Sequence, residues 1–366
     1  MKKLMLSTLI VIFCICLTPI QGLTCTTFVL DNNGQPIYGK NFDDPPLSAY
    51  MIVNKRGVAK TTSYSPATWT SKFGSVTFNF LTRELPFDGI NEAGLFISSM
   101  ALDHTEYPQD DSRPVLNVSQ WIQYQLDNFS TVDEVIASDK DVRPRDSSGG
   151  GGHWLVSDSQ GNSAIIEWLD GKMVCHTGQS MPVKVLVGPS GTYDNSIEYL
   201  TRYNGYGGIL PIALSKVLIR LRGLTPRNNS LPRFAWAAHL LQGKNASTAS
   251  VQDAFDILSA VAEPKISMAP TLCSFVYDMP NRTVYFRTLY NNKIRSFNLS
   301  LFDFSCSTPV KALDVNAKIS GDVTGTFVDY TEEMGRELLK KNAPSLSEDE
   351  VDFIVTYPDK YTHCTE

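Results

Sequence analysis

The sequence predicts an α+β domain in which antiparallel sheets are packed between layers of helices. Segments rich in β-forming residues fill much of 25–101 and return at 270–304. Apolar residues recur at helical spacing between 114 and 138, and a second mainly helical stretch covers 211–262. Strands and helices that alternate in blocks, with no internal repeat, favour a layered structure.

The chain begins with the features of a secretory signal peptide. Two lysines precede an apolar run from residue 4 to about 17, and Pro19 and Gly22 follow near the expected cleavage point. The run is shorter than the roughly 20 residues that span a bilayer. We expect residues 1–24 to be a signal peptide with any short propeptide, and the protein to be periplasmic or secreted without a stable membrane anchor.

Residues 25–366 are expected to form one domain with a peripheral helical tail. The hydrophobic share of 42% supports a sizeable core. The net charge of -6 and the absence of a basic block argue against nucleic acid as a partner. A small molecule is the expected partner, and the composition is compatible with a homo-oligomer.

The number and spacing of the cysteines indicate which disulfides and metal sites are possible. Seven cysteines occur, and those after the leader are Cys25, Cys175, Cys273, Cys306 and Cys364. In an exported protein four of them could pair and one would stay free; alternatively, the four downstream cysteines are buried thiols. No CxxC pair or Cys/His cluster has zinc spacing, so neither a metal nor a cofactor is expected.

The expected elements follow in order along the chain. Residues 25–43 form a hairpin, 51–60 and 69–80 are strands, and the loop 89–95 leads into another strand. A helix spans 118–129, and Thr131 with Glu134 caps the next short helix. After a flexible connection at 146–152, residues 153–177 form a three-stranded meander. The helical stretch 211–262 is interrupted by the loop 223–232, and strands return at 270–304.

The hairpin brings particular side chains near Cys25. If Asn33-Gly34 is the turn centre, Cys25 lies opposite Phe42. Lys40 then shares a face with Cys25, because side chains alternate along a strand. Asp43 points the other way and reaches the site only where the strand ends or bulges. The alternative is that Lys40 and Asp43 form an ordinary exposed pair at a strand end.

Cys25 would become the first residue once the leader is removed. It would then carry a thiol nucleophile and a free α-amine on one residue, and the amine can accept the thiol proton. A nearby cation lowers the pKa of a thiol. The alternative is a disulfide-bonded or buried cysteine that merely follows the cleavage site.

Several stretches resemble one family in order and spacing. They are CTTFVL at 25–30, GKNFD at 39–43, VNKRGVAK at 53–60, WTSKFGSVTFN at 69–79, GINEAGL at 89–95, WIQYQLD at 121–127, IIEWLDGKMV at 165–174, PRF at 232–234 and FVYDMPNRTVYFRT at 275–288. The chain resembles the choloylglycine hydrolase family, which includes bile salt hydrolases and penicillin V acylases.

The resemblance implies a four-layer αββα N-terminal-nucleophile hydrolase fold with two stacked antiparallel sheets. It implies hydrolysis of linear N-acyl amides through a thioester on Cys25. Asp43 matches the aspartate that holds the α-amine, and Arg233 matches a downstream arginine that supports the nucleophile. Lys40 stands where the family usually has arginine. The implied substrates are of the bile-salt, penicillin V or N-acyl-signal type.

Two departures from the family pattern concern the oxyanion hole. The family has an asparagine where this chain has Val187-Gly188, and another Asn or Tyr position falls near Ala101. Loss of one oxyanion donor costs roughly 3–4 kcal/mol. A backbone amide near Gly188 or the side chain of Asn195 is a candidate substitute.

Two other readings remain. A papain-like protease would need His153 or His239 to reach Cys25, and neither lies in a papain signature. A non-catalytic protein of the same fold would keep the acyl pocket for binding alone, and the departures at Lys40 and Gly188 motivate that alternative.

Overall fold

The structure is a computed structural model. It describes residues 25–31, 33–45, 47–62, 67–145, 151–189, 191–205, 230–244 and 248–365. The predicted leader, most of the predicted flexible connection and the first part of the predicted helical stretch lie outside the described residues. Among the described residues, no helix has the length and apolar character needed to cross a membrane.

Sheet A contains the hairpin that begins at Cys25. Its strands are β1 (Thr26–Leu30), β2 (Ile37–Asp43), β14 (Val185–Val187), β15 (Thr271–Asp278), β16 (Thr283–Thr288), β17 (Arg295–Asn298) and β19 (Gly321–Asp322). They lie in the order β14-β1-β2-β15-β16-β17-β19, and all pairs are antiparallel except the short β17–β19 pair. The hairpin strands β1 and β2 therefore lie inside the sheet, with β14 on one side and β15 on the other.

The β1–β2 register is the one that the turn predicts. Thr27 pairs with Lys40 and Thr26 with Asn41. Asn33 and Gly34 both have positive φ, 52° and 77°, which suits the Asn-Gly turn because these residues tolerate the left-handed region. The prediction that Lys40 and Cys25 share a face is thus confirmed in register.

Sheet B is antiparallel throughout. Its strands are β3 (Tyr50–Asn54), β6 (Ser75–Asn79), β7 (Asp88–Asn91), β8 (Phe96–Ala101), β11 (Gly152–Ser157), β12 (Ser163–Leu169), β13 (Lys172–Thr177), β18 (Lys311–Asp314) and β20 (Val328–Asp329). The order is β13-β12-β11-β8-β7-β6-β3-β18-β20. The meander predicted at 153–177 is β11-β12-β13.

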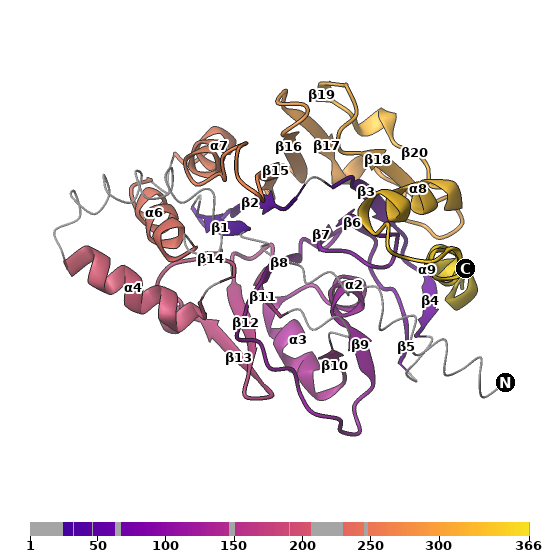
Figure 1. The fold of residues 1–366 in the computed structure, drawn as a ribbon, viewed down its shortest axis with the longest axis horizontal. Helices are drawn as coiled ribbons and strands as arrows, with labels where there is room; N and C mark the ends of the chain where they lie inside the picture. The colour runs from indigo at the N-terminus through magenta and orange to yellow at the C-terminus, as the bar shows by residue number, and fades with distance from the viewer. Residues whose placement is uncertain are drawn as a thin grey trace.

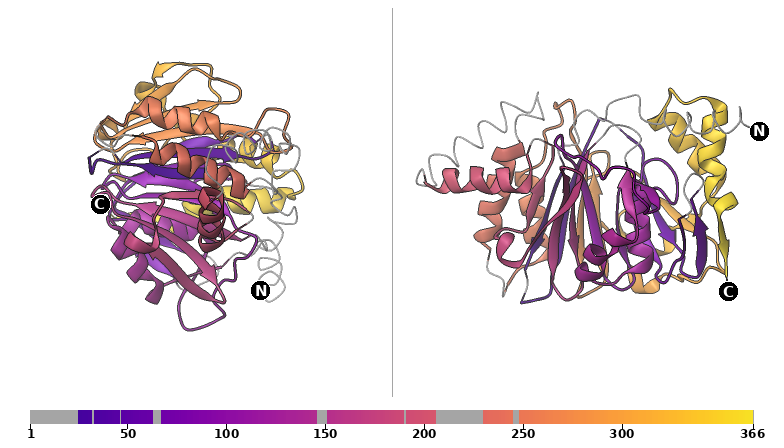
Figure 2. Two further views of the ribbon diagram at one scale, coloured as in Figure 1. Left: turned by 90° about the vertical axis from the view of Figure 1, so that its left-hand side faces the viewer. Right: turned by 90° about the horizontal axis from the view of Figure 1, so that it is seen from below.

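Helices cover the outer face of each sheet (Figures 1 and 2). Helices α6 (Ser230–Gln242) and α7 (Val251–Ala260) pack on sheet A, and α2 (Val118–Asn128) and α3 (Val132–Ala137) lie beyond sheet B. Helix α4 (Tyr193–Gly205) contacts α6. The layers run helix, sheet, sheet, helix, so the predicted four-layer α+β fold is confirmed.

Aromatic side chains fill two hydrophobic layers. Between the sheets, Tyr38 of β2 stacks on Phe96 of β8 with ring centroids 4.7 Å apart. Between sheet B and its helices, Trp121, Trp154 and Trp168 contact one another at 5.0–5.4 Å. Such pairs are typical of well-packed cores.

The C-terminal part forms a side layer next to sheet B. Helices α8 (Glu332–Asn342) and α9 (Glu348–Tyr361), yellow in Figure 1, lead to β21 (Thr362–Cys364), which pairs with β4 (Val58–Thr61) and through it β5 (Thr68–Thr70). A disulfide joins Cys306 to Cys364. The tail is helical as predicted, with a final strand that the sequence did not indicate.

Some predicted strands are divided. The stretch 51–60 becomes β3 and β4, separated at Gly57, whose φ of 71° fits a turn. The stretch 69–80 becomes β5 and β6, because the N–H groups of Lys72 and Phe73 bond to Asp127 instead of to a neighbouring strand. Two further short strands, β9 (Val115–Asn117) and β10 (Arg143–Arg145), form a small parallel pair.

Candidate active site

Cys25 lies directly before β1 and is buried completely. Its carbonyl accepts a hydrogen bond from the Gly188 N–H at 3.1 Å, which extends the β1–β14 ladder by one residue. The main-chain N–H of Asp43 lies 3.5 Å from the Cys25 sulfur, and the Asp43 carbonyl lies 3.9 Å from it. The thiol is therefore held against the end of β2.

The Asp43 carboxylate is on the helix side of sheet A, as the alternation of side chains predicts. It accepts a hydrogen bond from Nη2 of Arg233 at 2.7 Å and another from Oγ1 of Thr271 at 2.5 Å. Strand β2 ends at Asp43, and the β2–β15 register shifts between Thr271 and Cys273 at the same level. The sequence predicts that Asp43 reaches the site only where the strand ends or bulges. Both a strand end and a register shift are present here.

Arg233 ties this carboxylate to the start of β1. It projects from α6 and is fully buried, and its Nη2 also donates to Oγ1 of Thr26 at 2.5 Å. Its Nη1 donates to Glu263 at 2.9 Å, and its Nε donates to the Val261 carbonyl at 3.1 Å. A guanidinium held by two carboxylates and a carbonyl is rigid, because its planar fork is satisfied on several sides.

Glu263 and Thr271 belong to this network although the sequence analysis did not find them. The Glu263 N–H donates to Oγ1 of Thr271 at 2.8 Å, so the two residues support each other as well as Arg233 and Asp43. Glu263 follows α7 in a loop with a proline and a lysine. Such a glutamate is ordinarily exposed, and only its partner Arg233 could have indicated burial.

Lys40 reaches across from sheet A to sheet B. Its Nζ donates to the Ser99 carbonyl at 2.5 Å and lies 3.5 Å from the carboxylate of Asp88, and both side chains are fully buried. Asp88 also accepts a hydrogen bond from the Ser99 N–H at 2.7 Å. The alternative of an exposed strand-end pair is therefore wrong for Lys40, whose partner is Asp88. The sequence offered no signal for Asp88, because Asp-Gly ordinarily marks a turn.

The environment of Cys25 disfavours the thiolate in the 366-residue chain. Burial raises the pKa of the Cys25 thiol to about 12. The positive charge of Lys40 lowers this pKa, and the negative charges of Asp43 and Asp88 raise it. Burial also raises the pKa of Asp88 to about 6, although Lys40 and the Ser99 N–H act in the opposite direction.

The candidate oxyanion donors have other partners. The Gly188 N–H is used by the Cys25 carbonyl. Asn195 is exposed on α4, and its side chain accepts a hydrogen bond from Thr192 at 2.9 Å. Ala101, at the end of β8, has no polar side-chain group. The residues at these positions thus supply no side-chain amide toward Cys25.

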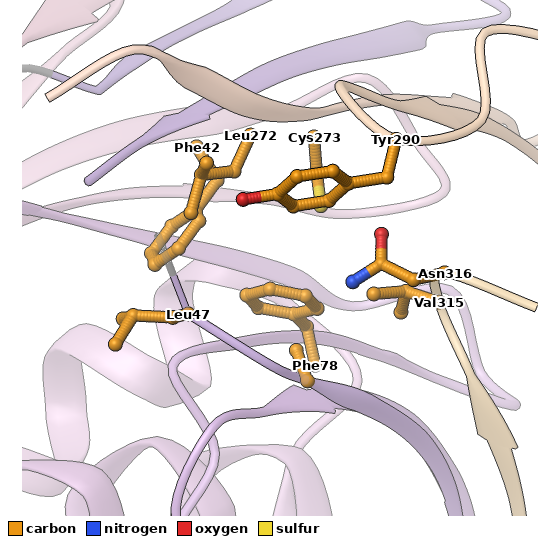
Figure 3. Close-up of a pocket in the computed structure, with 9 residues that line it drawn as sticks. Phe42, Leu47, Phe78, Leu272, Cys273, Tyr290, Val315 and Asn316 are labelled. Atoms are coloured by element: carbon orange, nitrogen blue, oxygen red, sulfur yellow. The ribbon is translucent and has the colours of Figure 1, made fainter. Parts of the chain in front are cut away.

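An apolar cavity lies next to the hairpin, on the Phe42 side. It is small, with room for about one water molecule, and is lined by Phe42, Leu47, Ala49, Phe78, Leu272, Cys273, Tyr290, Val315 and Asn316. Figure 3 shows Tyr290 and Phe78 on opposite sides of the cavity. Phe42 also contacts Phe80 and Phe87, which are only partly buried, at ring distances of 5.9 and 5.3 Å. Phe42 therefore belongs both to the cavity lining and to a cluster with two partly exposed aromatic rings.

The two histidines of the papain-like reading have other roles. His153 is fully buried and lies 3.1 Å from Glu167 through Nδ1. His239 is exposed and stacks on Trp236 at 5.6 Å. Each histidine has a structural partner, and neither forms the Cys-His pair that this reading needs.

The remaining cysteines divide between the two predicted possibilities. Cys306 and Cys364 are paired, and Cys175 and Cys273 are free, as is Cys25. Cys273 is buried beside Phe42 in the cavity. Among the described residues, no group of three or more His, Cys, Asp or Glu side chains is arranged to hold a metal ion.

Comparison with known proteins gives matches of three kinds. The family model "Linear amide C-N hydrolases, choloylglycine hydrolase family" matches residues 25–312. Penicillin V acylase of Pectobacterium atrosepticum is 32% identical over 208 residues, which are 51% of this chain and 54% of that protein. The match thus spans about half the length of this curated relative.

Solved structures share the fold. Penicillin V acylase from Agrobacterium tumefaciens has a TM-score of 0.69 and 25% identity, with 84% of this chain and 98% of that chain covered. A variant of conjugated bile acid hydrolase from Clostridium perfringens has a TM-score of 0.68 and 20% identity, with 81% and 98% covered. Since the family model spans most of the sequence from Cys25 onward, the chain belongs to the choloylglycine hydrolase family of linear amide C-N hydrolases.

Proposed function

We propose that this protein is an exported hydrolase of linear N-acyl amides and that Cys25, as the first residue of the mature chain, is its nucleophile. The observation that carries this proposal is the placement of Cys25 itself. Its sulfur lies against the main chain of Asp43, whose carboxylate is fixed by Arg233 and Thr271. The family match begins at the same residue.

The proposed reaction proceeds through a thioester. The α-amine of Cys25 accepts the thiol proton, and the thiolate attacks the carbonyl carbon of the substrate amide. The tetrahedral intermediate collapses as the ammonium returns the proton to the leaving amine, which breaks the C–N bond. Water, deprotonated by the same amine, then attacks the thioester, and the carboxylic acid and the Cys25 thiol are released.

The supporting residues position the two reacting groups of Cys25. Asp43 orients the α-amine and Arg233 holds Asp43, so the amine faces the thiol in a fixed geometry. Lys40 provides a positive charge that favours the thiolate, with Asp88 as its counter-ion. A lysine acts here as a point charge, since it lacks the bidentate fork of arginine.

The acyl part of the substrate is proposed to be apolar. The cavity beside Phe42 and the partly exposed rings of Phe80 and Phe87 offer an aromatic surface along β2, the strand whose last residue contacts the Cys25 sulfur. An apolar pocket with few polar groups is the usual form of a small-molecule site. Acyl groups of the bile-salt, phenoxyacetyl and long-chain N-acyl-signal types share this chemistry.

Maturation is part of the proposal because Thr24 acylates the nitrogen of Cys25 in the 366-residue chain. An amide nitrogen cannot act as the base, so residues 1–24 must be removed. Signal-peptide cleavage, with trimming of any residue left before Cys25, places the mature protein in the periplasm or outside the cell.

A second candidate function is binding of an acyl ligand without catalysis. It is favoured by the Gly188 N–H, which is already bonded to Cys25, and by the absence of a side-chain amide at Ala101. In that case the fold and the aromatic cavity persist, but an N-acyl amide remains intact in the site.

One experiment separates these functions. The mature protein and its Cys25→Ala and Cys25→Ser variants are tested against a panel of N-acyl amides, with amine release as the readout and N-terminal sequencing of each sample. We expect turnover by protein that begins Cys-Thr-Thr-Phe, none for Cys25→Ala and at most a trace for Cys25→Ser.

Three results would contradict the catalytic proposal. Activity in Cys25→Ala would assign the reaction to another residue. Full activity in protein that begins at Leu23 would exclude the α-amine as the base. Binding of panel members by the wild type without any turnover would favour the acyl-binding function.

A further inference from the structure

The C-terminal segment 331–364 lies beyond the family match, which ends at residue 312. It consists of α8, α9 and β21, and it forms its own apolar cluster through Leu339, Val351, Ile354 and Val355. Leu81 and Leu85 pack against this cluster from the loop between β6 and β7. The segment therefore lies outside the family match and rests on the loop that joins Phe80 to β7.

Through Asn342 this segment forms hydrogen bonds to the main chain near the cavity. It is the last residue of α8, and its Oδ1 accepts a hydrogen bond from the Ser48 N–H at 2.9 Å. Its Nδ2 donates to the Ser48 carbonyl at 2.7 Å and to the Phe80 carbonyl at 2.6 Å. One amide group thus fixes two separate segments of the chain relative to each other.

Both segments carry residues of the proposed acyl site. Leu47 and Ala49, on either side of Ser48, line the cavity. The ring of Phe80 contacts Phe42 at 5.9 Å and Phe87 at 5.3 Å. The bonds of Asn342 therefore link the main chain of a cavity-lining segment to the main chain of Phe80 in the aromatic cluster.

Further contacts hold the segment in place. Near the start of α8, the hydroxyl of Tyr330 lies 3.0 Å from Thr82, and Asp359 of α9 forms an ion pair with Arg83. Tyr357 donates to the Thr61 carbonyl at 3.1 Å and accepts from Gln120 at 2.7 Å. The segment thus contacts the 80–85 loop, β4 and α2. These contacts fix the position of α8, and therefore that of Asn342 at its end.

We propose that the C-terminal segment 331–364 determines the acyl selectivity of this protein, with Asn342 as the positioning residue that sets the 47–49 segment against the Phe42–Phe80–Phe87 cluster. The inference rests on the proposed function of the site. It assigns substrate selection to a part of the chain that the family model does not include.

The test compares two ligands within each sample, N-phenoxyacetylglycine and N-acetylglycine. The ratio of their kcat/KM values does not depend on how much of the protein is folded, so it separates selectivity from stability. The ratio of their Kd values is measured by calorimetry in mature protein with Cys25→Ala, where no turnover occurs. Variants are Asn342→Asp, which replaces the Nδ2 donor by a carboxylate oxygen, and Asn342→Ala.

Asn91→Asp is the matched control. The Asn91 amide also donates to two carbonyls, those of Leu126 and Phe129, and its Oδ1 accepts from two N–H groups, but it joins β7 to α2 on the other side of sheet B. Lys341→Ala, at an exposed neighbour of Asn342, is the neutral control.

We expect both Asn342 variants to lower the preference for the phenoxyacetyl ligand by roughly tenfold, the range of a misplaced contact in an apolar pocket. Both controls should keep the wild-type ratio. An unchanged ratio in the Asn342 variants, or an equal change in Asn91→Asp, overturns the inference. If Asn342→Asp does not fold, Asn342→Ala and Asn342→Ser decide the result.

The two proposals fail in different ways. Absence of turnover by wild-type mature protein contradicts the hydrolase function, whereas the Kd ratio in the Cys25→Ala background still decides the role of Asn342. Failure of the Cys25→Ala protein to bind either ligand overturns the selectivity inference, and the hydrolase function is then decided by the panel of N-acyl amides.

Discussion

The positive charge of Lys40 is fully buried, and it acts on two groups: it pairs with the Asp88 carboxylate and it lowers the pKa of the Cys25 thiol. Asp88 lies 3.5 Å from its Nζ, and the Cys25 thiol responds to both charges. A buried charge needs a partner, because desolvation of an isolated ion costs several kcal/mol. Asp88 therefore makes Lys40 tolerable in the core and at the same time weakens the effect of Lys40 on the thiol.

This arrangement predicts opposite effects of two substitutions on Cys25. Lys40→Met should raise the pKa of the thiol, because the charge that lowers it is lost, and Lys40→Arg should leave the pKa near the wild-type value. Asp88→Asn should lower the pKa, because a negative charge that raises it is removed. The measurement is the rate of Cys25 alkylation from pH 7 to 10 in the 366-residue chain, followed by mass spectrometry of the Cys25 peptide.

Peptide-level detection is needed because Cys175 and Cys273 are also free. Below a pKa of about 12 the alkylation rate rises with pH in every variant, so the variants are compared at the same pH. Identical curves for wild type and Lys40→Met would remove Lys40 from the site. A slower reaction in Asp88→Asn would contradict the role of Asp88 as a weakening partner.

What the sequence could predict about the site follows from local geometry. Asn33-Gly34 fixes the hairpin register, and the register fixes which side chains share the face of Cys25, so Lys40 is predictable. Asp88 and Glu263 come from other elements, and their burial depends on how the two sheets and α7 pack. No local pattern contains that information.

At the scale of elements, the start of α4 illustrates how a buried carboxylate can organise a loop. Glu167 of β12 accepts a hydrogen bond from the Tyr193 N–H at 2.9 Å, at the first residue of α4. The positive end of a helix stabilises such a charge. His153 lies 3.1 Å from one Glu167 oxygen and His176 lies 3.6 Å from the other. The hydrogen bond to Glu167 thus fixes the first residue of α4, which lies five residues after Gly188 in the sequence.

Glu167 makes stability depend on acid pH. Burial alone raises its pKa, but the hydrogen bonds from His153 and the Tyr193 N–H, together with the nearby His176 ring, outweigh burial and lower the pKa from 4.5 to about 2. The stabilisation is therefore complete above pH 4.5 and is lost as the pH falls toward 2. It amounts to on the order of 3 kcal/mol.

The corresponding test is urea unfolding of wild type and Glu167→Gln at pH 7, 5 and 3. The difference in unfolding free energy between the two should be largest at pH 7 and smaller at pH 3. Buried Asp88 and Asp127, whose pKa values are raised to about 6, act in both proteins and cancel in this difference. Glu198→Gln, on the exposed side of α4, should show no such trend. A difference that stays constant with pH would contradict this assignment.

The element boundaries show a second limit of sequence-based prediction. The predicted strand 69–80 contains a break that arises from contact with Asp127 of α2, an interaction distant in sequence. The meander and helix α2 were predicted correctly because their apolar periodicity is uninterrupted. Strands interrupted by tertiary contacts lack that regularity.

At the scale of the whole molecule, the disulfide joins the end of the chain to the segment before β18. Sequence alone cannot pair cysteines, since four of them allow three connectivities. The structure pairs Cys306 with Cys364 across a sequence separation of 58 residues and leaves Cys175 and Cys273 free. The connectivity is set by β21, which aligns with β4 and places Cys364 near Cys306.

Removal of this disulfide should lower the stability of the protein by about 2–4 kcal/mol, the usual contribution of a disulfide that closes a long loop. The measurement is urea unfolding of wild type and of the double variant Cys306→Ser with Cys364→Ser, both without reductant. Cys175→Ser is the control and should unfold close to the wild type. If added reductant destabilises the wild type and the double variant equally, the disulfide is not the source of the effect.

The same disulfide changes what one cut in the backbone can do. Residues 306–364 form a covalent ring, so a protease that cleaves once between α8 and α9 opens the ring but releases no fragment. The two pieces stay tethered, and each remains at a high local concentration near its partner surface. A nicked molecule would migrate as a single species on a non-reducing gel and as two fragments after reduction, with Asn342 still beside Ser48 until the tether is broken.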